Sequence, residues 1–94
     1  MTADTQPITP GSCLALGPLF RLQWETAQDA WVLLYPEGMV QLNRSAGEIL
    51  RRLDGQRTVA QLIQQLEQDF KQPGLQDDVL DFLQLARQKA WVRP

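Results

Sequence analysis

Apolar and polar residues alternate from Phe20 to Glu25, which is the period of a strand with one buried face. Residues 30–35 are apolar on both faces, as expected of a middle strand that is covered on both sides. A turn at 36–38 contains proline and glycine, and a third short strand is expected at 39–42. Because the links between these strands are short, the pattern predicts a three-stranded antiparallel meander.

Two helices with capping signals follow the third strand. Asn43 or Ser45 can cap the first helix, since Ser45 begins an S-x-x-E capping box, and Gly55 is expected to end it. Thr58 opens the second helix with a similar T-x-x-Q pattern, and Pro73-Gly74 is expected to stop it. Each helix has an apolar stripe of roughly 100°, so each is expected to bury one face against one core.

The third predicted helix, at about 76–89, is apolar over a wider arc of roughly 220°. Such a helix is either buried between two packed layers or keeps a second face for a partner, and the pattern leaves both open. Residues 90–92 can form a short final strand. Three strands followed by three helices predict an α+β domain: a three-stranded antiparallel sheet and a three-helix bundle in a winged-helix-like arrangement.

The predicted domain covers residues 19–94, and a chain of 94 residues is long enough for one domain with a modest core. Residues 1–18 contain three prolines and two glycines among small polar residues. They are therefore expected to form a flexible N-terminal arm with one docked piece at 13–16.

Composition argues against several kinds of function. The chain has no histidine and one cysteine, Cys13, which excludes an internal disulfide and a zinc site made of cysteine and histidine. A net charge of −2 argues against a nucleic-acid partner. No apolar run approaches the roughly 18 to 20 residues of a membrane span, and no secretory signal is visible. We expect a cytoplasmic protein without metal, cofactor or membrane contact.

The third strand is expected to be the open edge of the sheet, because it is the last strand of the meander. It is short and uncharged, with no proline or lysine to prevent pairing with another chain. Its brevity alone could protect it, or the N-terminal arm could cover it. An open edge beside an unusually apolar helix otherwise forms a groove in which an extended peptide adds a strand. The residues expected to bind a peptide are Gly38, Met39, Val40, Gln41 and Leu42 in the strand, and Val79, Leu80, Phe82, Leu83 and Ala86 in the helix.

Arg44, Arg51, Arg52 and Arg57 cluster around the first helix. One interpretation is a solvated face with ion pairs to Glu48, each worth about 0.3–0.5 kcal/mol. The other is a docking patch for an acidic peptide or a partner enzyme.

Two other function classes, DNA binding and catalysis, depend on how Asp77, Asp78, Asp81 and Cys13 are interpreted, and neither is favoured. A winged-helix-like shape suggests a DNA-binding or regulatory domain, but these carboxylates would oppose phosphate at the start of the third helix. Acids at a helix start are also more often dipole partners than metal ligands. Cys13 has no histidine to activate it, so catalysis is not expected.

The segments 34–43 and 45–50 resemble the PqqD family, whose members are small accessory proteins of pyrroloquinoline quinone (PQQ) biosynthesis. Asp54-Gly55 and Thr58-Val59 also match the pattern expected after the first helix. The resemblance covers roughly residues 19–94.

This resemblance implies a peptide-binding domain of the kind called a RiPP recognition element, which recognises ribosomally made precursor peptides. The implied partners are the precursor peptide PqqA and PqqE, a radical SAM enzyme that carries the iron–sulfur clusters. The implied site is the third strand together with the third helix. We therefore expect a non-catalytic adaptor that presents PqqA to PqqE, as a monomer or as a weak homodimer formed by strand exchange.

Overall fold

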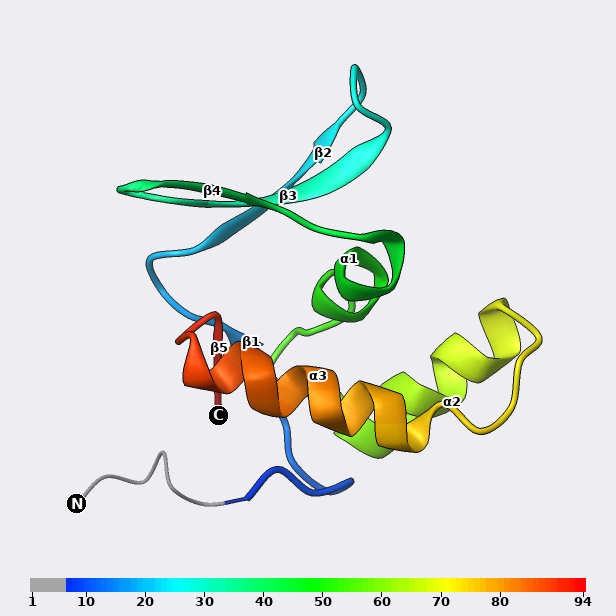
Figure 1. Cartoon of the computed structure of the whole chain (residues 1–94). Helices are drawn as coiled ribbons and strands as arrows, with labels where there is room; N and C mark the ends of the chain where they lie inside the picture. The colour runs from blue at the N-terminus through cyan, green and yellow to red at the C-terminus, as the bar shows by residue number, and fades with distance from the viewer. Residues whose placement is uncertain (1–6) are drawn as a thin grey trace.

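The computed structural model describes residues 7–94 and has the predicted α+β architecture (Figure 1). In chain order the elements are β1 (Ala15–Leu16), β2 (Arg21–Glu25), β3 (Ala30–Tyr35), β4 (Gly38–Gln41), α1 (Arg44–Leu50), α2 (Val59–Asp69), α3 (Gln76–Gln88) and β5 (Val92–Arg93). The main sheet has the order β2-β3-β4 with antiparallel pairs, which confirms the meander.

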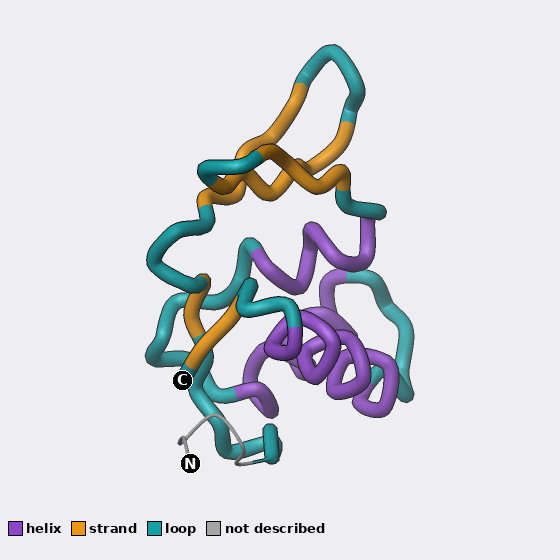
Figure 2. Tube along the Cα trace, turned by 60° about the vertical axis from the view of Figure 1, so that its left-hand side comes forward, coloured by secondary structure: helices purple, strands orange, loops and turns teal. Residues whose placement is uncertain are grey.

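The elements form layers. The sheet lies on one side of α1, and α2 and α3 lie on the other side, so that α1 separates the sheet from the other helices (Figures 1 and 2). One core runs through these layers, and its fully buried members include Leu33 from β3, Leu50 from α1, Leu62 from α2 and Leu83 from α3. Burying each such side chain stabilises the fold by about 1.5–3 kcal/mol. In the described residues, no helix has the length and apolar character to cross a membrane.

The caps explain where α1 and α2 begin. Asn43 caps α1, since its Oδ1 accepts from the backbone N–H of Ala46 at 2.8 Å, so the alternative cap Ser45 lies inside the helix. Thr58 caps α2 through the predicted capping box: its Oγ1 accepts from the backbone N–H of Gln61 at 3.1 Å, and its own N–H donates to Gln61 Oε1 at 2.8 Å. The end of α2 was predicted less well: the helix ends at Asp69, before Pro73-Gly74.

The N-terminal segment contributes more than a single docked piece. Ile8 and Leu14 belong to the core, with exposed fractions of 7% and 2%. The N–H of Val59 donates to the carbonyl oxygen of Ser12 at 2.8 Å, which ties this segment to α2. β1 pairs with β5, so the short final strand exists, at 92–93 instead of 90–92. The part of the expected arm at 1–6 lies outside the described residues.

Gly47 lets α1 approach the sheet closely. A Cβ at this position would lie within 2.7 Å of Trp31 Cγ and 2.8 Å of Trp31 Cβ, both closer than real contacts allow. Glycine in a helix normally costs about 1 kcal/mol relative to alanine, so close packing is the evident reason for its presence here.

We therefore predict that Gly47→Ala destabilises the protein by about 1–3 kcal/mol, because the cost of overpacking exceeds the gain in helix propensity. Urea unfolding measures this change. Gly11→Ala is the matched control, because a Cβ at Gly11 meets only Thr9 Oγ1, at 3.8 Å. A Gly47→Ala protein as stable as the original would show that α1 and β3 are not in close contact.

Candidate functional site

β4 is an open edge of the sheet, as predicted, because its only strand partner among the described residues is β3. Just past β4, the N–H of Leu42 donates to the carbonyl oxygen of Trp31 at 3.0 Å. In an antiparallel ladder, hydrogen-bonded and non-hydrogen-bonded residue pairs alternate. With the register Leu33↔Val40, the backbone of Val40 therefore pairs with β3, and Met39 and Gln41 direct their N–H and C=O groups away from the sheet.

The sequence analysis expected residues 38–42 to bind the peptide, and the register indicates which of them have backbone groups free to pair with it. The N–H of Leu42 is used inside the sheet, and so are the groups of Val40. Only Met39 and Gln41 have both backbone groups available to an added strand. Gly38 is opposite Tyr35, at the turn end of β4.

Within residues 7–94 the sheet has a second open edge, at β2, but the side chains of β2 differ from those of β4. β2 begins with Arg21 and ends with Glu25, whereas β4 contains no charged residue. Charged side chains are a common means of keeping an edge strand from pairing with another chain. The edge at β4 is thus the better acceptor for an extended peptide.

A groove of about 560 Å³ begins where β4 ends. It lies between the start of α1, the end of α2 and the first half of α3, and no β4 residue lines it. Its lining combines apolar and polar side chains: Asn43, Arg44, Ser45, Ala46, Glu48, Ile49, Leu66, Phe70, Gln72, Leu75, Asp78, Val79 and Phe82.

The structure distributes the five residues of α3 that the sequence selected. Val79, Leu83 and Ala86 are at most 3% exposed and belong to the core. Leu80 and Phe82 are half-buried and pack against that core, and Phe82 also lines the groove together with Val79. Most of the wide apolar arc therefore serves burial, the simpler of the two interpretations.

Sequence reasoning missed Phe70 and Leu75 as groove residues. Phe70 continues the apolar period of the second helix, which predicts burial, but the helix ends one residue earlier and leaves Phe70 37% exposed. The available signal was Pro73-Gly74, which predicted a break but not its position. Leu75 extends the apolar arc of the third helix by one residue, and it lines the groove just before α3 begins.

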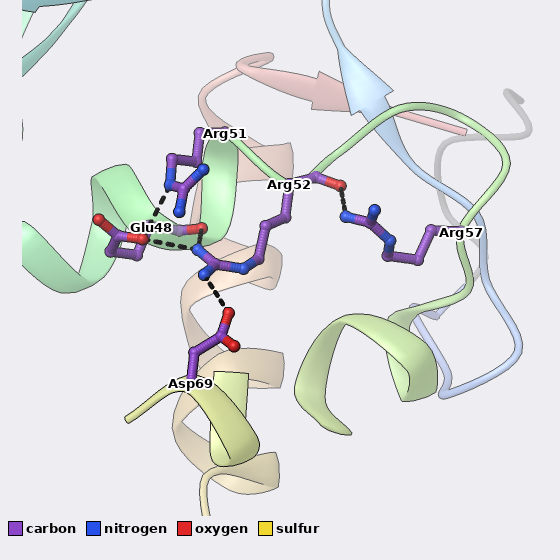
Figure 3. A network of polar contacts seen from close by, with 5 residues as sticks. All are labelled: Glu48, Arg51, Arg52, Arg57 and Asp69. Carbon is purple, nitrogen blue, oxygen red and sulfur yellow. Dashed lines mark hydrogen bonds and ion pairs between the residues drawn. The ribbon is translucent and has the colours of Figure 1, made fainter. Parts of the chain in front are cut away.

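Three of the four clustered arginines take part in one internal network (Figure 3). Arg52 is 7% exposed and binds Glu48 at 2.6 Å and Asp69 at 2.7 Å, which joins α1 to the end of α2. Arg51 binds the same Glu48 oxygen at 2.8 Å. Arg57 donates from Nη1 to the backbone oxygen of Arg52 at 2.7 Å. The ion pairs to Glu48 are as expected, but Arg52 is buried instead of lying on a solvated face, and its contacts hold α1 and α2 together.

Arg44 is placed differently. Its guanidinium lies 5.4 Å from the ring centroid of Phe70, and it lines the groove. It also lines a second hollow of about 370 Å³ beside Trp24 and Trp31. Of the four arginines, it is the one that lines the groove.

The network changes the acidity of Glu48. Burial raises the pKa of this carboxyl, but hydrogen bonds from Arg52 and Arg51 and their positive charges outweigh that effect. The pKa of Glu48 is therefore below its ordinary value of 4.5. The backbone N–H groups of Arg57 and Gln56 likewise lower the pKa of Asp54.

The acidic residues at the start of α3 argue against binding of DNA by this helix. Asp77 and Asp78 lie in the first turn, where carboxylates complement the partial positive charge of the helix N-terminus. Both are exposed, as is Asp81, so they would meet phosphate with unfavourable charge.

Comparisons with known proteins agree on one family. The family model for coenzyme PQQ synthesis protein D (PqqD) matches residues 30–92. A PqqA binding protein of Azotobacter vinelandii is 50% identical over 74 residues, which are 78% of this chain and 80% of the relative. A PqqA binding protein of Methylococcus capsulatus is 41% identical over 86 residues, which are 92% of each chain.

A solved structure is also similar. It is the solution NMR structure of the PqqD part of Methylobacterium extorquens PqqCD, described as a functional and stand-alone RiPP recognition element. The TM-score is 0.80 at 26% identity, and the match covers 99% of this chain and 100% of that one. The shared fold supports the resemblance that the sequence indicated.

The Glu48 network predicts a specific acid sensitivity. Because the pKa of Glu48 is lower in the folded state, its contribution to stability is present above about pH 4.5 and is lost as the pH falls through the folded value. Glu48→Gln should lower stability at neutral pH and reduce the further loss between about pH 7 and about pH 3. Urea unfolding midpoints at several pH values measure both effects. Glu37→Gln is the control, because Glu37 is an exposed acid in the β3–β4 turn. If the unaltered protein, Glu48→Gln and Glu37→Gln lost the same stability on acidification, the contribution assigned to Glu48 would be contradicted.

Proposed function

Because the chain belongs to the family of coenzyme PQQ synthesis protein D, we propose that it is a non-catalytic adaptor of PQQ biosynthesis that binds the precursor peptide PqqA. The relatives named PqqA binding protein and the similar RiPP recognition element support this role. The peptide joins the sheet as an additional strand at β4.

The observation that supports strand addition best is the chemistry of the β4 edge. Met39 and Gln41 direct one donor and one acceptor each away from the sheet, on a strand without charge or proline. An extended peptide satisfies these groups, and each net hydrogen bond contributes about 0.5–1.5 kcal/mol. Because the edge is held in place by β3, little conformational entropy is lost by the protein on binding.

The groove can add side-chain selectivity to this backbone pairing. The strand ends at Gln41 and the groove begins at Asn43, so a peptide that extends past the strand reaches the groove directly. Phe70, Leu75 and Phe82 supply apolar surface there. Apolar walls with a few polar groups at the rim are typical of ligand sites.

We further propose that the adaptor presents the bound peptide to the radical SAM enzyme PqqE. In this arrangement the iron–sulfur chemistry belongs to the enzyme, and this chain supplies only recognition and placement. The role requires a free β4 edge, so a homodimer that paired two β4 strands would compete with the peptide.

A backbone substitution tests strand addition directly. Met39→Pro removes an N–H that points away from the sheet, and proline is tolerated at such edge positions. We expect the variant to fold and to bind synthetic PqqA about tenfold more weakly, measured by isothermal titration calorimetry. Met39→Ala is the matched control, because it removes the side chain and keeps the N–H. Equal affinities of the two variants would argue against pairing through Met39.

Val40→Pro gives the complementary result. The Val40 N–H pairs with β3, so its loss should destabilise the sheet itself by about 3 kcal/mol or more. Thermal unfolding followed by circular dichroism measures this loss. If Val40→Pro remained fully stable while Met39→Pro unfolded, the inferred direction of the backbone groups would be reversed.

A further inference from the structure

The four arginines around α1 differ in what they have left to offer a ligand. Arg51 and Arg52 share Glu48, and Arg57 donates to a backbone oxygen. Within residues 7–94, Arg44 has no carboxylate at ion-pair distance, and it lines the groove. Arg44 is therefore the arginine of this group whose charge is available to a bound peptide.

The side chain of Arg44 is held in place by a contact with an aromatic ring. Its guanidinium lies 5.4 Å from the ring centroid of Phe70, an arrangement of the cation–π type. Phe70 follows Asp69, which Arg52 holds at 2.7 Å, and the Arg52 guanidinium lies 6.0 Å from the same ring. The network thus fixes the platform on which Arg44 rests, so a ligand need not order this long side chain from solution.

The two sides of the groove, formed by α1 and α3, carry opposite charges. Arg44 contributes a positive charge on the α1 side of the groove, and Asp78 contributes a negative charge on the α3 side. Glu48 also lines the groove, but its charge is compensated by Arg51 and Arg52. A carboxylate in this groove is therefore favoured only on the α1 side, next to the end of β4.

The chain as a whole does not attract acidic ligands, since its net charge is −2. Recognition of an acidic side chain must then depend on a local cation. A guanidinium can bind a carboxylate through two parallel N–H···O bonds, which lysine cannot reproduce.

We propose that Arg44 is a specificity-determining residue that binds an aspartate or glutamate side chain of the peptide where the peptide passes from the β4 edge into the groove. This inference rests on the proposed function. It adds the chemical class of one side chain that the site selects.

A double-mutant cycle tests the pairing. The probes are synthetic PqqA and a set of variants in which each acidic residue is replaced singly by its amide. Binding of each probe is measured by calorimetry to the unaltered protein and to Arg44→Gln, Arg44→Lys and Arg21→Gln. Arg21 is an exposed arginine of β2, the opposite edge strand, and controls for the loss of one positive charge.

Arg44→Gln is expected to weaken binding of unaltered PqqA roughly three- to tenfold, with Arg44→Lys in between and Arg21→Gln near the original value. One amide variant should lose as much affinity as Arg44→Gln does, and the two changes together should cost no more than either alone. Additive effects for every acidic position, or equal effects of Arg44→Gln and Arg21→Gln, would overturn the proposal. A failure of the unaltered protein to bind any of the peptides would instead contradict the proposed function itself.

Discussion

Unpaired backbone groups on the outer side of β4 are the constraint on which the site depends. Backbone N–H and C=O groups form strong hydrogen bonds wherever a partner is available. An uncharged edge strand that leaves these groups unpaired is therefore a place where another chain can add a strand. The connection from this edge to α1 is short. Leu42 still hydrogen-bonds to β3, and the next residue, Asn43, is already the N-cap of α1.

The close approach of α1 to the sheet also fixes the position of the β4 edge relative to the helices. Gly47 lets the helix lie directly against Trp31, while Arg52 ties the far end of α1 to the end of α2. Close packing and ion pairs therefore connect the edge strand, α1 and the end of α2. Such pre-organisation reduces the entropy that is lost when an extended peptide is ordered on the surface.

The parts of the fold that depend on local pattern could be predicted from the sequence. Alternation located β2, two-sided apolarity located β3, and the capping box at Thr58 located the start of α2. Features that depend on contacts between distant segments could not. The sequence suggested a docked piece at 13–16 and a final strand at 90–92, but it did not show that the two pair, and it gave no sign that Ile8 is buried.

The site shows the same division. Edge logic led correctly to β4 as an open strand, but only the observed hydrogen bond of Leu42 shows which backbone groups point outward. The wide apolar arc of α3 left open a face for a partner. In the structure, however, Val79, Leu83 and Ala86 are buried in the core, because the helix packs within the bundle. Phe70 became a groove residue only because α2 ends at Asp69.

The most direct measurement is isotope-filtered NMR of labelled protein bound to unlabelled PqqA peptide. If the peptide adds to the sheet at β4, intermolecular contacts will connect its backbone protons to the amide and Hα protons of Met39 and Gln41, in the pattern of adjacent strands. Contacts that instead gather at Leu22 and Trp24 on the β2 edge, or on the helices alone, would contradict strand addition at β4.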